Sequence, residues 1–183
     1  GKTLVAGVAA CHALEEGWQV ALMAPTEILA EQHYLNFKQW FEPLGITVSW
    51  LSGKQKGKAR AAAEQSIQNG SAQLVVGTHA LFQDNVAFAK LGLVIIDEQH
   101  RFGVDQRLAL RNKGVDNTTP HQLVMTATPI PRTLAMSAYG DLDTSVIDEL
   151  PPGRTPIQTV TIPLDRREQV LQRIASNCLE GKQ

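Results

Sequence analysis

The sequence predicts an α/β fold built on a mostly parallel, doubly wound sheet. Two observations predict it: apolar runs alternate with helix-patterned segments along all 183 residues, and several of these runs are continuously apolar, as in strands that are covered on both faces. Repeated strand–helix units form parallel sheets with helices on both faces. The predicted strands cover residues 19–25, 47–52, 72–78, 91–97, 122–128, 144–150 and 157–163.

Helix-patterned segments lie between these strands. A helix over 4–16 is expected to end at Gly17, because glycine readily adopts the left-handed conformation that closes helices. Thr26 is the expected N-cap of a helix over 27–41. On that helix, one apolar side is expected to hold Leu29, Phe37, Trp40 and Leu44. Further helices are expected over 57–69, 79–89, 104–112 and 131–139, and from Asp165 onward.

The composition is that of a globular protein: 43% of the residues are hydrophobic and 19% are charged. A net charge of −1 gives no global basic field, although a local basic groove can still bind nucleic acid. Cys11 and Cys178 lack metal-ligand spacing and suit a reducing compartment. No apolar run approaches the roughly 18 residues that span a membrane, so no membrane role is expected.

The two ends and one internal turn bear on domain organisation. The chain begins at Gly1, inside a motif-like triplet, and ends without a break in its pattern, so we expect a piece of a longer protein. The stretch ELPPGRTP at 149–156 is typical of a linker-like turn. We therefore expect a main α/β body over 1–150, followed over 151–183 by a connecting strand and helix that lead towards a second part.

The loops after the strands are the expected place of function. In parallel sheets, chemistry collects at the carboxyl ends of the strands. The residues that follow positions 25, 78, 97 and 128 therefore share one edge. The first three residues, GKT, precede a helix in the same region of the fold.

The GKT triplet matches the end of the phosphate-binding motif GxxxxGK[ST]. In such motifs, backbone amides hold phosphate, the lysine reaches the β- and γ-phosphates, and the hydroxyl binds Mg²⁺. Only the last third of the motif is present here, and a GK[ST] triplet occurs by chance in about one chain of this length in ten. Taken alone, the triplet equally fits the start of a surface helix.

Two adjacent acids follow the apolar run LVII at 93–96. Asp97, at the strand tip, suits a Mg²⁺ site, and Glu98, which should point elsewhere, suits a base that orients and deprotonates water. Gln99 and His100 could bond across to neighbouring loops and sense the nucleotide. The alternative is a solvated DEQHR loop, which is the commoner meaning of an acidic pair after a strand. The GKT start of the same chain favours the catalytic interpretation.

A third candidate is TATPIPRT at 126–133, where two threonines and two prolines make a rigid, polar turn. On local grounds it is an ordinary strand-to-helix loop. The order of the segments favours function: GKT, APTEILAEQ, VGTHAL, DEQH and TATP follow one another along the chain.

This ordered set resembles superfamily 2 helicases and translocases over nearly the whole chain. The runs DEQHRFGVDQR, MTATPIPRTLAMSAYGDLD and IDELPPGRTPI are most similar to the RecG family of bacterial branched-DNA helicases. The transcription-repair coupling translocases are near relatives, but their motif usually reads DEEH where this chain has Gln99. The resemblance implies a RecA-like, three-layer P-loop NTPase lobe, the first of two motor lobes, without the first strand of the family fold.

The resemblance also implies roles for individual residues. Catalysis is assigned to Lys2, Asp97, Glu98 and His100, and nucleotide binding to Gly1, Lys2, Thr3 and Asp97, with Thr3 and Asp97 at the metal. Coupling between hydrolysis and movement is assigned to Thr126, Thr128 and Arg132, together with His100. Contact with DNA is assigned to Pro25, Thr26, Gly77, Thr78 and Phe102. Small residues, hydroxyls and helix-start amides suit such contacts because they approach backbone phosphates closely.

Some roles have two interpretations. Arg101 and Phe102 could sense DNA or stack on a base, or they could fill the gap between a helix and the sheet. Arg132 could bond to DNA or to the catalytic loop, or it could cap a helix, and a coupling role is slightly favoured.

The implied cofactors are ATP and Mg²⁺. The implied partners are branched double-stranded DNA, such as forks and four-way junctions, and single-stranded-DNA-binding protein. The implied state is a monomer in the bacterial cytoplasm, associated with the nucleoid. A non-catalytic nucleotide- or DNA-binding module is the alternative from another class, and Glu98 argues against it because a binding module has no use for a base. A P-loop kinase or transporter ATPase does not explain TATP and DEQH.

The chain also departs from the family. The strand before GKT and the first glycines of the phosphate loop are absent, so we expect an exposed slot in the sheet, flanked by unpaired edges, and weakened ATP binding. The second lobe, with its arginine, and the N-terminal wedge are absent too. We therefore expect this chain alone to be inactive, and the function to belong to the parent protein.

Residues outside these motifs receive structural interpretations. Trp18, Trp40 and Trp50 are expected to pack, with Trp18 half exposed. His12, His33 and His121 have no partners at metal-ligand spacing and are interpreted as structural or solvated. The run KQKGKAR at 54–60 is the only basic cluster, and we interpret it as a solvated helix start, with a minor phosphate contact as the alternative.

Overall fold

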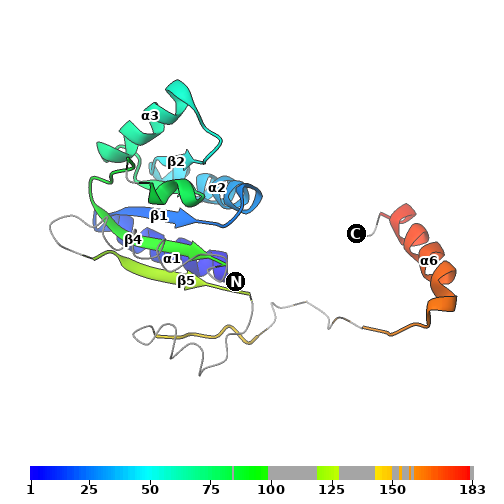
Figure 1. Cartoon of the computed structure of the whole chain (residues 1–183). Coiled ribbons are helices and arrows are strands. Elements are labelled where there is room, and N and C mark those ends of the chain that lie inside the picture. Colours follow the sequence, from blue (N-terminus) through cyan, green and yellow to red (C-terminus); the bar gives the residue numbers. More distant parts are fainter. Residues whose placement is uncertain are drawn as a thin grey trace. The chain divides into compact units, whose positions relative to one another are not determined.

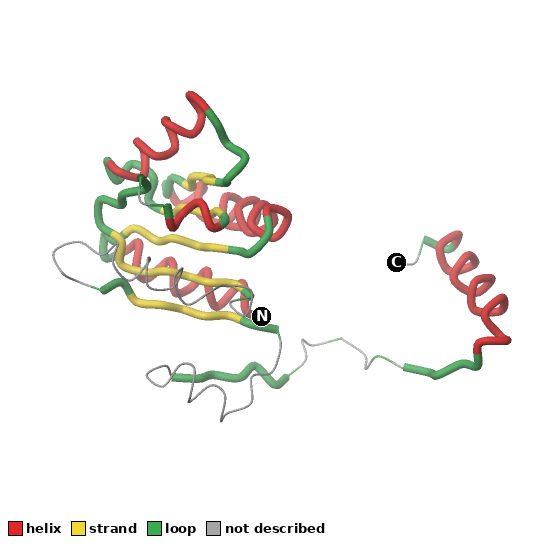
Figure 2. The backbone as a smooth tube through the Cα atoms, viewed as in Figure 1, coloured by secondary structure: helices red, strands yellow, loops and turns green. Residues whose placement is uncertain are grey.

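A computed structural model describes residues 1–83, 85–98, 119–127, 143–149, 153, 157 and 159–181. Five described strands form one sheet in the order β2-β3-β1-β4-β5, and every neighbouring pair is parallel (Figures 1 and 2). The strands are β1 Gln19–Met23, β2 Val48–Leu51, β3 Leu74–Gly77, β4 Leu91–Asp97 and β5 His121–Met125. The predicted parallel α/β class is confirmed.

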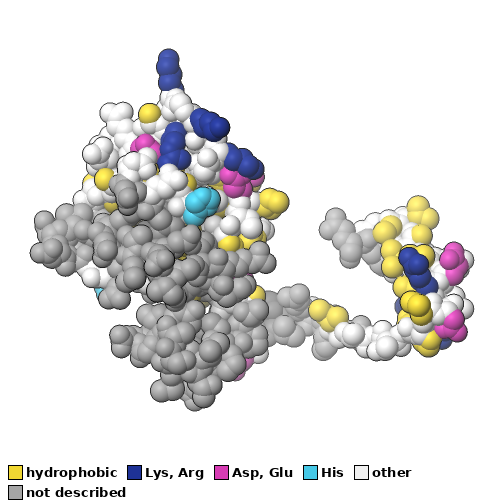
Figure 3. All heavy atoms as spheres, viewed as in Figure 1, with side chains coloured by type: hydrophobic (Ala, Val, Ile, Leu, Met, Phe, Trp, Pro, Cys, Tyr) yellow, Lys and Arg dark blue, Asp and Glu magenta, His cyan; other side chains and the backbone are white. Residues whose placement is uncertain are grey.

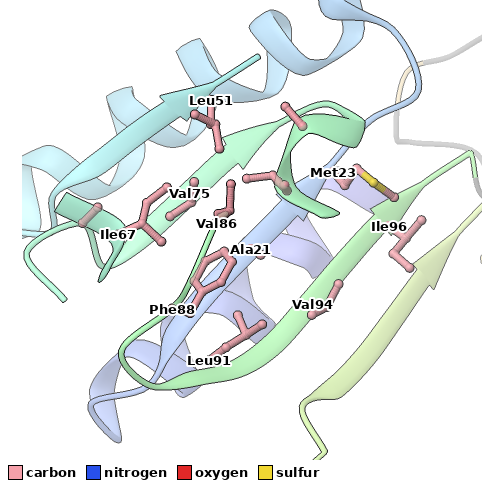
Figure 4. Close-up of a cluster of buried hydrophobic side chains, with 13 residues drawn as sticks. Ala21, Met23, Leu51, Ile67, Val75, Val86, Phe88, Leu91, Val94 and Ile96 are labelled. Carbon is pink, nitrogen blue, oxygen red and sulfur yellow. The ribbon is translucent and has the colours of Figure 1, made fainter. Parts of the chain in front are cut away.

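Helices pack on both faces of this sheet. Side chains from α1 Lys2–Glu15 and α2 Glu27–Phe41 form one apolar cluster with the sheet. Side chains from α3 Gly57–Gln68, the 3₁₀ helix η2 His79–Phe82 and the segment 86–88 form the cluster on the other face (Figure 4). The layers explain why the strands are continuously apolar.

Strand β1 shows this two-sided burial directly. Val20 and Leu22 belong to the cluster with α1 and α2, and Ala21 and Met23 belong to the opposite cluster. All five residues of β1 are buried. Fully burying an aliphatic side chain contributes about 1.5–3 kcal/mol to folding. Strand β1 therefore stabilises the apolar clusters on both faces of the sheet.

The predicted helix ends are confirmed at two places. Helix α1 ends before Gly17, whose φ is +75° and whose N–H donates to the Leu14 carbonyl at 3.0 Å. The Thr26 hydroxyl accepts a hydrogen bond from the Leu29 N–H at 3.4 Å, which caps α2. Glycine and threonine therefore act here for the reasons that the sequence suggested.

The buried side of α2 differs from the predicted side. Phe37 is fully buried as expected, but Leu44 is 67% exposed, because it lies beyond the helix in the short 3₁₀ helix η1 Glu42–Leu44. The residues of α2 that are buried are Ala30, His33, Phe37 and Phe41. Their spacing of three, four and four residues defines one face of a helix, and it places a histidine in the core.

The predicted helix over 79–89 is wrong beyond its first turn. Only η2 is helical among the described residues of this range. After it, Val86 and Phe88 are buried while Ala87 and Ala89 are exposed. This period of two is typical of an extended segment and not of a helix. The predicted helices over 104–112 and 131–139 lie outside the described residues.

Two predicted strands are not strands. Residues 143–149 and the described residues of 157–163 are exposed and irregular. Val146 and Ile157, for example, are 78% and 81% exposed. An isolated apolar segment has no ladder to join, because its N–H and C=O groups need a neighbouring strand.

The expected slot in the sheet is also absent from the described strands. Strand β1 pairs with β3 and β4, and β4 pairs with β5, without a gap. The outer strands are β2 and β5. The described sheet is therefore continuous, and a further strand could pair only with one of its outer strands, β2 or β5.

The tryptophans pack as predicted. Trp18 lies against Gly92, where an added Cβ would approach its ring to 2.6 Å, and the Lys90 ammonium lies 4.3 Å from the centre of the ring. Trp50 contacts the Tyr34 ring, and Trp40 lies beside Gly7 of α1. The last contact joins α1 to α2.

The chain divides into two compact units, Gly1–Ile147 and Asp148–Gln183. The second unit contains the 3₁₀ helix η4 Leu164–Arg166 and the helix α6 Arg167–Leu179, near the position predicted for a last helix. None of the described helices has the length and apolarity that crossing a membrane requires.

Gly77 is required by the approach of two strands. A Cβ at this position would lie 2.0 Å from the Leu51 carbonyl oxygen of β2, which is backbone and cannot move aside locally. We expect Gly77→Ala to lower the free energy of unfolding by about 3 kcal/mol, at the upper end of the overpacking range. Urea unfolding measures this loss. Gly53→Ala is the control, because its Cβ would meet only the His79 ring at 3.7 Å, and equal losses in the two variants would contradict the explanation.

Candidate functional site

The parallel register brings four strand ends to one level. Met23 of β1 pairs with Gly77 of β3 and with Ile96 of β4, and Asp97 of β4 pairs with Met125 of β5. The segments that follow these strands therefore begin along one edge of the sheet. Three of the predicted motifs and the start of α2 emerge there.

Glu98 adopts an unusual backbone conformation just after β4. Its φ is +52°, and no other non-glycine residue in the described part of the chain has a positive φ. A conformation of this kind costs about 1–3 kcal/mol and is held in place by its surroundings. Here the Glu98 N–H donates to the Met125 carbonyl at 2.9 Å, and Oε1 accepts from the Ala127 N–H at 3.2 Å. The end of β5 thus fixes both the backbone and the side chain of Glu98.

Lys2 reaches the same carboxylate from α1. Its Nζ lies 3.6 Å from Glu98 Oε1, and the two side chains are 36% and 20% exposed. Gly1 is the N-cap of α1 and offers no side-chain cap, and no acid lies in the first turn. The helix start therefore presents uncapped amides beside a lysine, which is the arrangement that binds phosphate. These residues fit the triphosphate of a nucleotide.

Asp97 contacts a different helix from Glu98. Its Oδ2 lies 2.7 Å from Nε2 of His33 on α2, and both side chains are nearly buried. Glu98 lies just beyond the end of β4 and has a left-handed backbone conformation, so the two acids have different neighbours. Asp97 is bound by α2, and Glu98 is bound by α1 and the segment after β5.

The sequence did not indicate that His33 lies at this site. Its position with Ala30, Phe37 and Phe41 on one helical face was the available signal of burial. The helical pattern could not identify the partner of His33, because Asp97 lies 64 residues further along the chain. His12 and His121 are exposed, as solvated histidines are.

The other predicted site residues fall into three groups. Thr3 and Thr126 are partly buried at the same edge as Glu98, and Pro25 and Thr26 begin α2. Gly77 and Thr78 are buried; Thr78 is 2% exposed, and its hydroxyl has no hydrogen-bond partner within the described structure. The residues His100, Phe102, Thr128 and Arg132 lie outside the described part of the chain, as do Gln99 and Arg101.

The basic cluster over 54–60 is the start of α3. Figure 3 shows its dark blue side chains around α3 and the turn before it. Lys54 pairs with Glu27, and Arg60 pairs with Glu64 at 2.8 Å. The hydrogen bond and the charge of Glu27 raise the pKa of Lys54 above its ordinary value. Two of the cluster's cations are thus neutralised by nearby acids, as in a solvated helix start.

A cavity of about 630 Å³ lies at the opposite end of the strands from Lys2 and Glu98, where the strands begin. It is lined by residues at the amino ends of three strands, among them Trp18, Leu91 and His121, and by residues of α1. None of the predicted site residues lines it. Lys2, Asp97 and Glu98 lie at the carboxyl ends of the strands, away from this cavity.

Comparison with protein families matches residues 1–137 to the DEAD/DEAH box helicases. Among curated proteins, the ATP-dependent DNA helicase RecG of Escherichia coli strain K12 is 65% identical over 185 aligned residues; the match covers 100% of this chain and 27% of RecG. RecG of Haemophilus influenzae is 63% identical, with 100% of this chain and 26% of that protein covered. The chain thus spans about a quarter of the length of these relatives.

Solved structures of helicases are also similar to this chain. A structure of RecG bound to a three-way DNA junction matches with a TM-score of 0.83 and 45% identity, over 99% of this chain and 24% of that one. The DUF1998 helicase MrfA bound to DNA matches with a TM-score of 0.60 over 75% of this chain and 19% of that one. MrfA is only 17% identical, so this second likeness concerns the fold, which is that of a RecA-like lobe.

The ion pair between Lys2 and Glu98 contributes little to folding. Partly exposed pairs contribute about 0–1 kcal/mol, so we expect Lys2→Met to lower the free energy of unfolding by less than about 1 kcal/mol. Urea unfolding without nucleotide tests this. Leu22→Ala, in the core, provides the scale with an expected loss of about 2–5 kcal/mol. A comparable loss in Lys2→Met would show that the pair holds the fold together.

Proposed function

This chain belongs to the DEAD/DEAH box helicase family, and we propose that it is the first motor lobe of an ATP-driven DNA translocase. In this proposal the whole protein remodels stalled replication forks and branch-migrates four-way junctions. The observation that carries the proposal is the meeting of Lys2, Asp97 and Glu98 at one edge of the sheet. The likeness to RecG supports the choice of branched DNA as substrate.

The start of α1 and the tip of β4 are the proposed nucleotide site. Gly1, Lys2 and Thr3 hold the phosphates through helix-start amides, an ammonium and a hydroxyl. Thr3 and Asp97 would hold Mg²⁺, for which hydroxyl and carboxylate oxygens are suitable ligands. When bound, ATP with Mg²⁺ supplies the phosphoryl group whose hydrolysis drives movement. The uncapped first turn of α1 supports this assignment.

Glu98 is the proposed base that orients the attacking water and accepts its proton. Its conformation supports this role, because strained residues persist at sites where a side chain must be held in one direction. Its hydrogen bond from Ala127 places it against the TATP segment. That contact supports a coupling role for the segment, and we assign the role to Thr126, Thr128, Arg132 and His100.

DNA contact is proposed along the same edge, by Pro25, Thr26, Gly77, Thr78 and Phe102. The amides at the start of α2 can reach a phosphate while Thr26 caps the helix. The buried Gly77 and Thr78 would contribute through the main chain. Backbone contacts suffice because movement along DNA does not require base identity.

The organisation of the whole protein is part of the proposal. Residues 1–150 form the lobe, and 151–183 connect it to a second motor lobe whose arginine completes the site. We place the protein in the bacterial cytoplasm at the nucleoid, as a monomer that meets single-stranded-DNA-binding protein at forks. The bacterial source of the similar proteins supports this placement.

The proposal predicts that ATP hydrolysis by the intact protein is strongly stimulated by a model replication fork. Glu98→Gln removes the base and should lower the fork-stimulated rate about 10²-fold or more. The control is His12→Gln, because this histidine is exposed and, among the described residues, forms an ion pair with Glu15 at the surface. It should hydrolyse ATP at the wild-type rate.

Three DNA conditions separate the candidate functions: fork, linear duplex and no DNA. Stimulation by the fork above the duplex is the expected result. Equal rates on fork and duplex would favour a transcription-repair coupling translocase. A wild-type protein without DNA-dependent hydrolysis would leave a non-catalytic nucleotide- or DNA-binding module.

A further inference from the structure

We propose that His33 is a positioning residue that orients the Asp97 carboxylate towards Mg²⁺. The inference rests on the proposed function, in which Asp97 holds the metal. It adds a residue from α2, outside the phosphate loop and the acidic motif, to the machinery of the nucleotide site.

The contact uses one oxygen of Asp97 and leaves the other available. His33 Nε2 lies 2.7 Å from Asp97 Oδ2, in surroundings that leave the two side chains only 9% and 13% exposed. Among the described residues, the hydrogen bond to Asp97 is made at Oδ2 and not at Oδ1. A carboxylate anchored through one oxygen has a fixed plane, so its second oxygen points in one direction.

The other ring nitrogen of His33 makes no competing contact. Nδ1 is buried and has no hydrogen-bond partner among the described residues. The bond from Nε2–H to Asp97 Oδ2 is therefore the one that fixes the ring within the described structure.

Helix α2 holds the imidazole in place. The ring meets Phe37 edge-on, with 6.4 Å between the ring centres, and Ala30 and Phe37 are fully buried on the same face. Further along the helix, Trp40 lies beside Gly7 of α1. The helix therefore contacts both the element that carries Lys2 and the strand that carries Asp97.

An apolar side chain would be the simpler choice if His33 only filled space. Burying a histidine and a carboxylate is unfavourable unless they bond to each other, and here they do so at the tip of the strand that ends in the acidic pair. Partners that hydrogen-bond metal-binding side chains set their orientation, and their loss typically weakens metal binding. Position and chemistry both match that role.

The test compares His33→Gln with His33→Met in the intact protein. Glutamine and methionine have nearly the same length, but only glutamine can donate a hydrogen bond to Asp97. The measurement is binding of a fluorescent ADP analogue during a Mg²⁺ titration, so it does not depend on hydrolysis. We expect the Mg²⁺ concentration at half-saturation to rise about tenfold or more in His33→Met. His33→Gln should retain most of the wild-type affinity for Mg²⁺.

His33→Asn provides a second variant without the contact, because its amide is too short to reach Asp97, and it should behave like His33→Met. It replaces His33→Met if thermal unfolding shows that the latter does not fold. Wild-type Mg²⁺ dependence in either of these variants would overturn the inference. An equal loss of Mg²⁺ affinity in all three His33 variants would also overturn the inference, because the shape of the ring and not its hydrogen bond would then matter. If wild-type protein itself shows no Mg²⁺-dependent nucleotide binding, the proposed function fails first.

Discussion

The parallel pairing of β1, β3, β4 and β5 is the constraint on which the site depends. Because the strands run in one direction and pair without a gap, their carboxyl ends reach one edge together. Residues separated by about half of the chain, such as Lys2 and Glu98, thus come within 3.6 Å of each other. A shift of one residue between β4 and β5 would remove the hydrogen bonds that hold Glu98.

The acidic pair shows how two similar side chains at a strand end are held by different contacts. Asp97 is still in β4 and bonds to a helix on one face. Glu98 leaves the strand in a left-handed conformation and is bonded to the segment after β5. The folding energy that the strained conformation costs is offset by the buried sheet beneath it. The same two acids in a flexible loop would repel each other and would share one environment.

Local signals predicted much of this structure. The run LGLVIID predicted both ends of β4, and Thr26 and Gly17 predicted two helix ends. These features could be predicted because apolar runs, helix caps and glycine turns depend on residues that are close in sequence. His33 was interpreted as structural or solvated, and it is buried, but its partner Asp97 could not be predicted because it is distant in sequence and close only in the fold. The segment after η2 and the apolar residues 144–150 were misread for a related reason: whether an apolar stretch becomes helix, strand or neither depends on the surface that it finds. The functional roles of all the predicted site residues stay predictions, and His100, Phe102, Thr128 and Arg132 lie outside the described residues.

We propose that nucleotide binds at the carboxyl ends of the strands, between the start of α1 and the ends of β4 and β5. Amide hydrogen exchange of the intact protein can test this, with and without Mg²⁺ and a non-hydrolysable ATP analogue. We expect joint protection of peptides that contain residues 1–5, 96–98 and 125–127. Protection confined to residues 9–18 and 119–121, which border the cavity at the opposite edge, would contradict it.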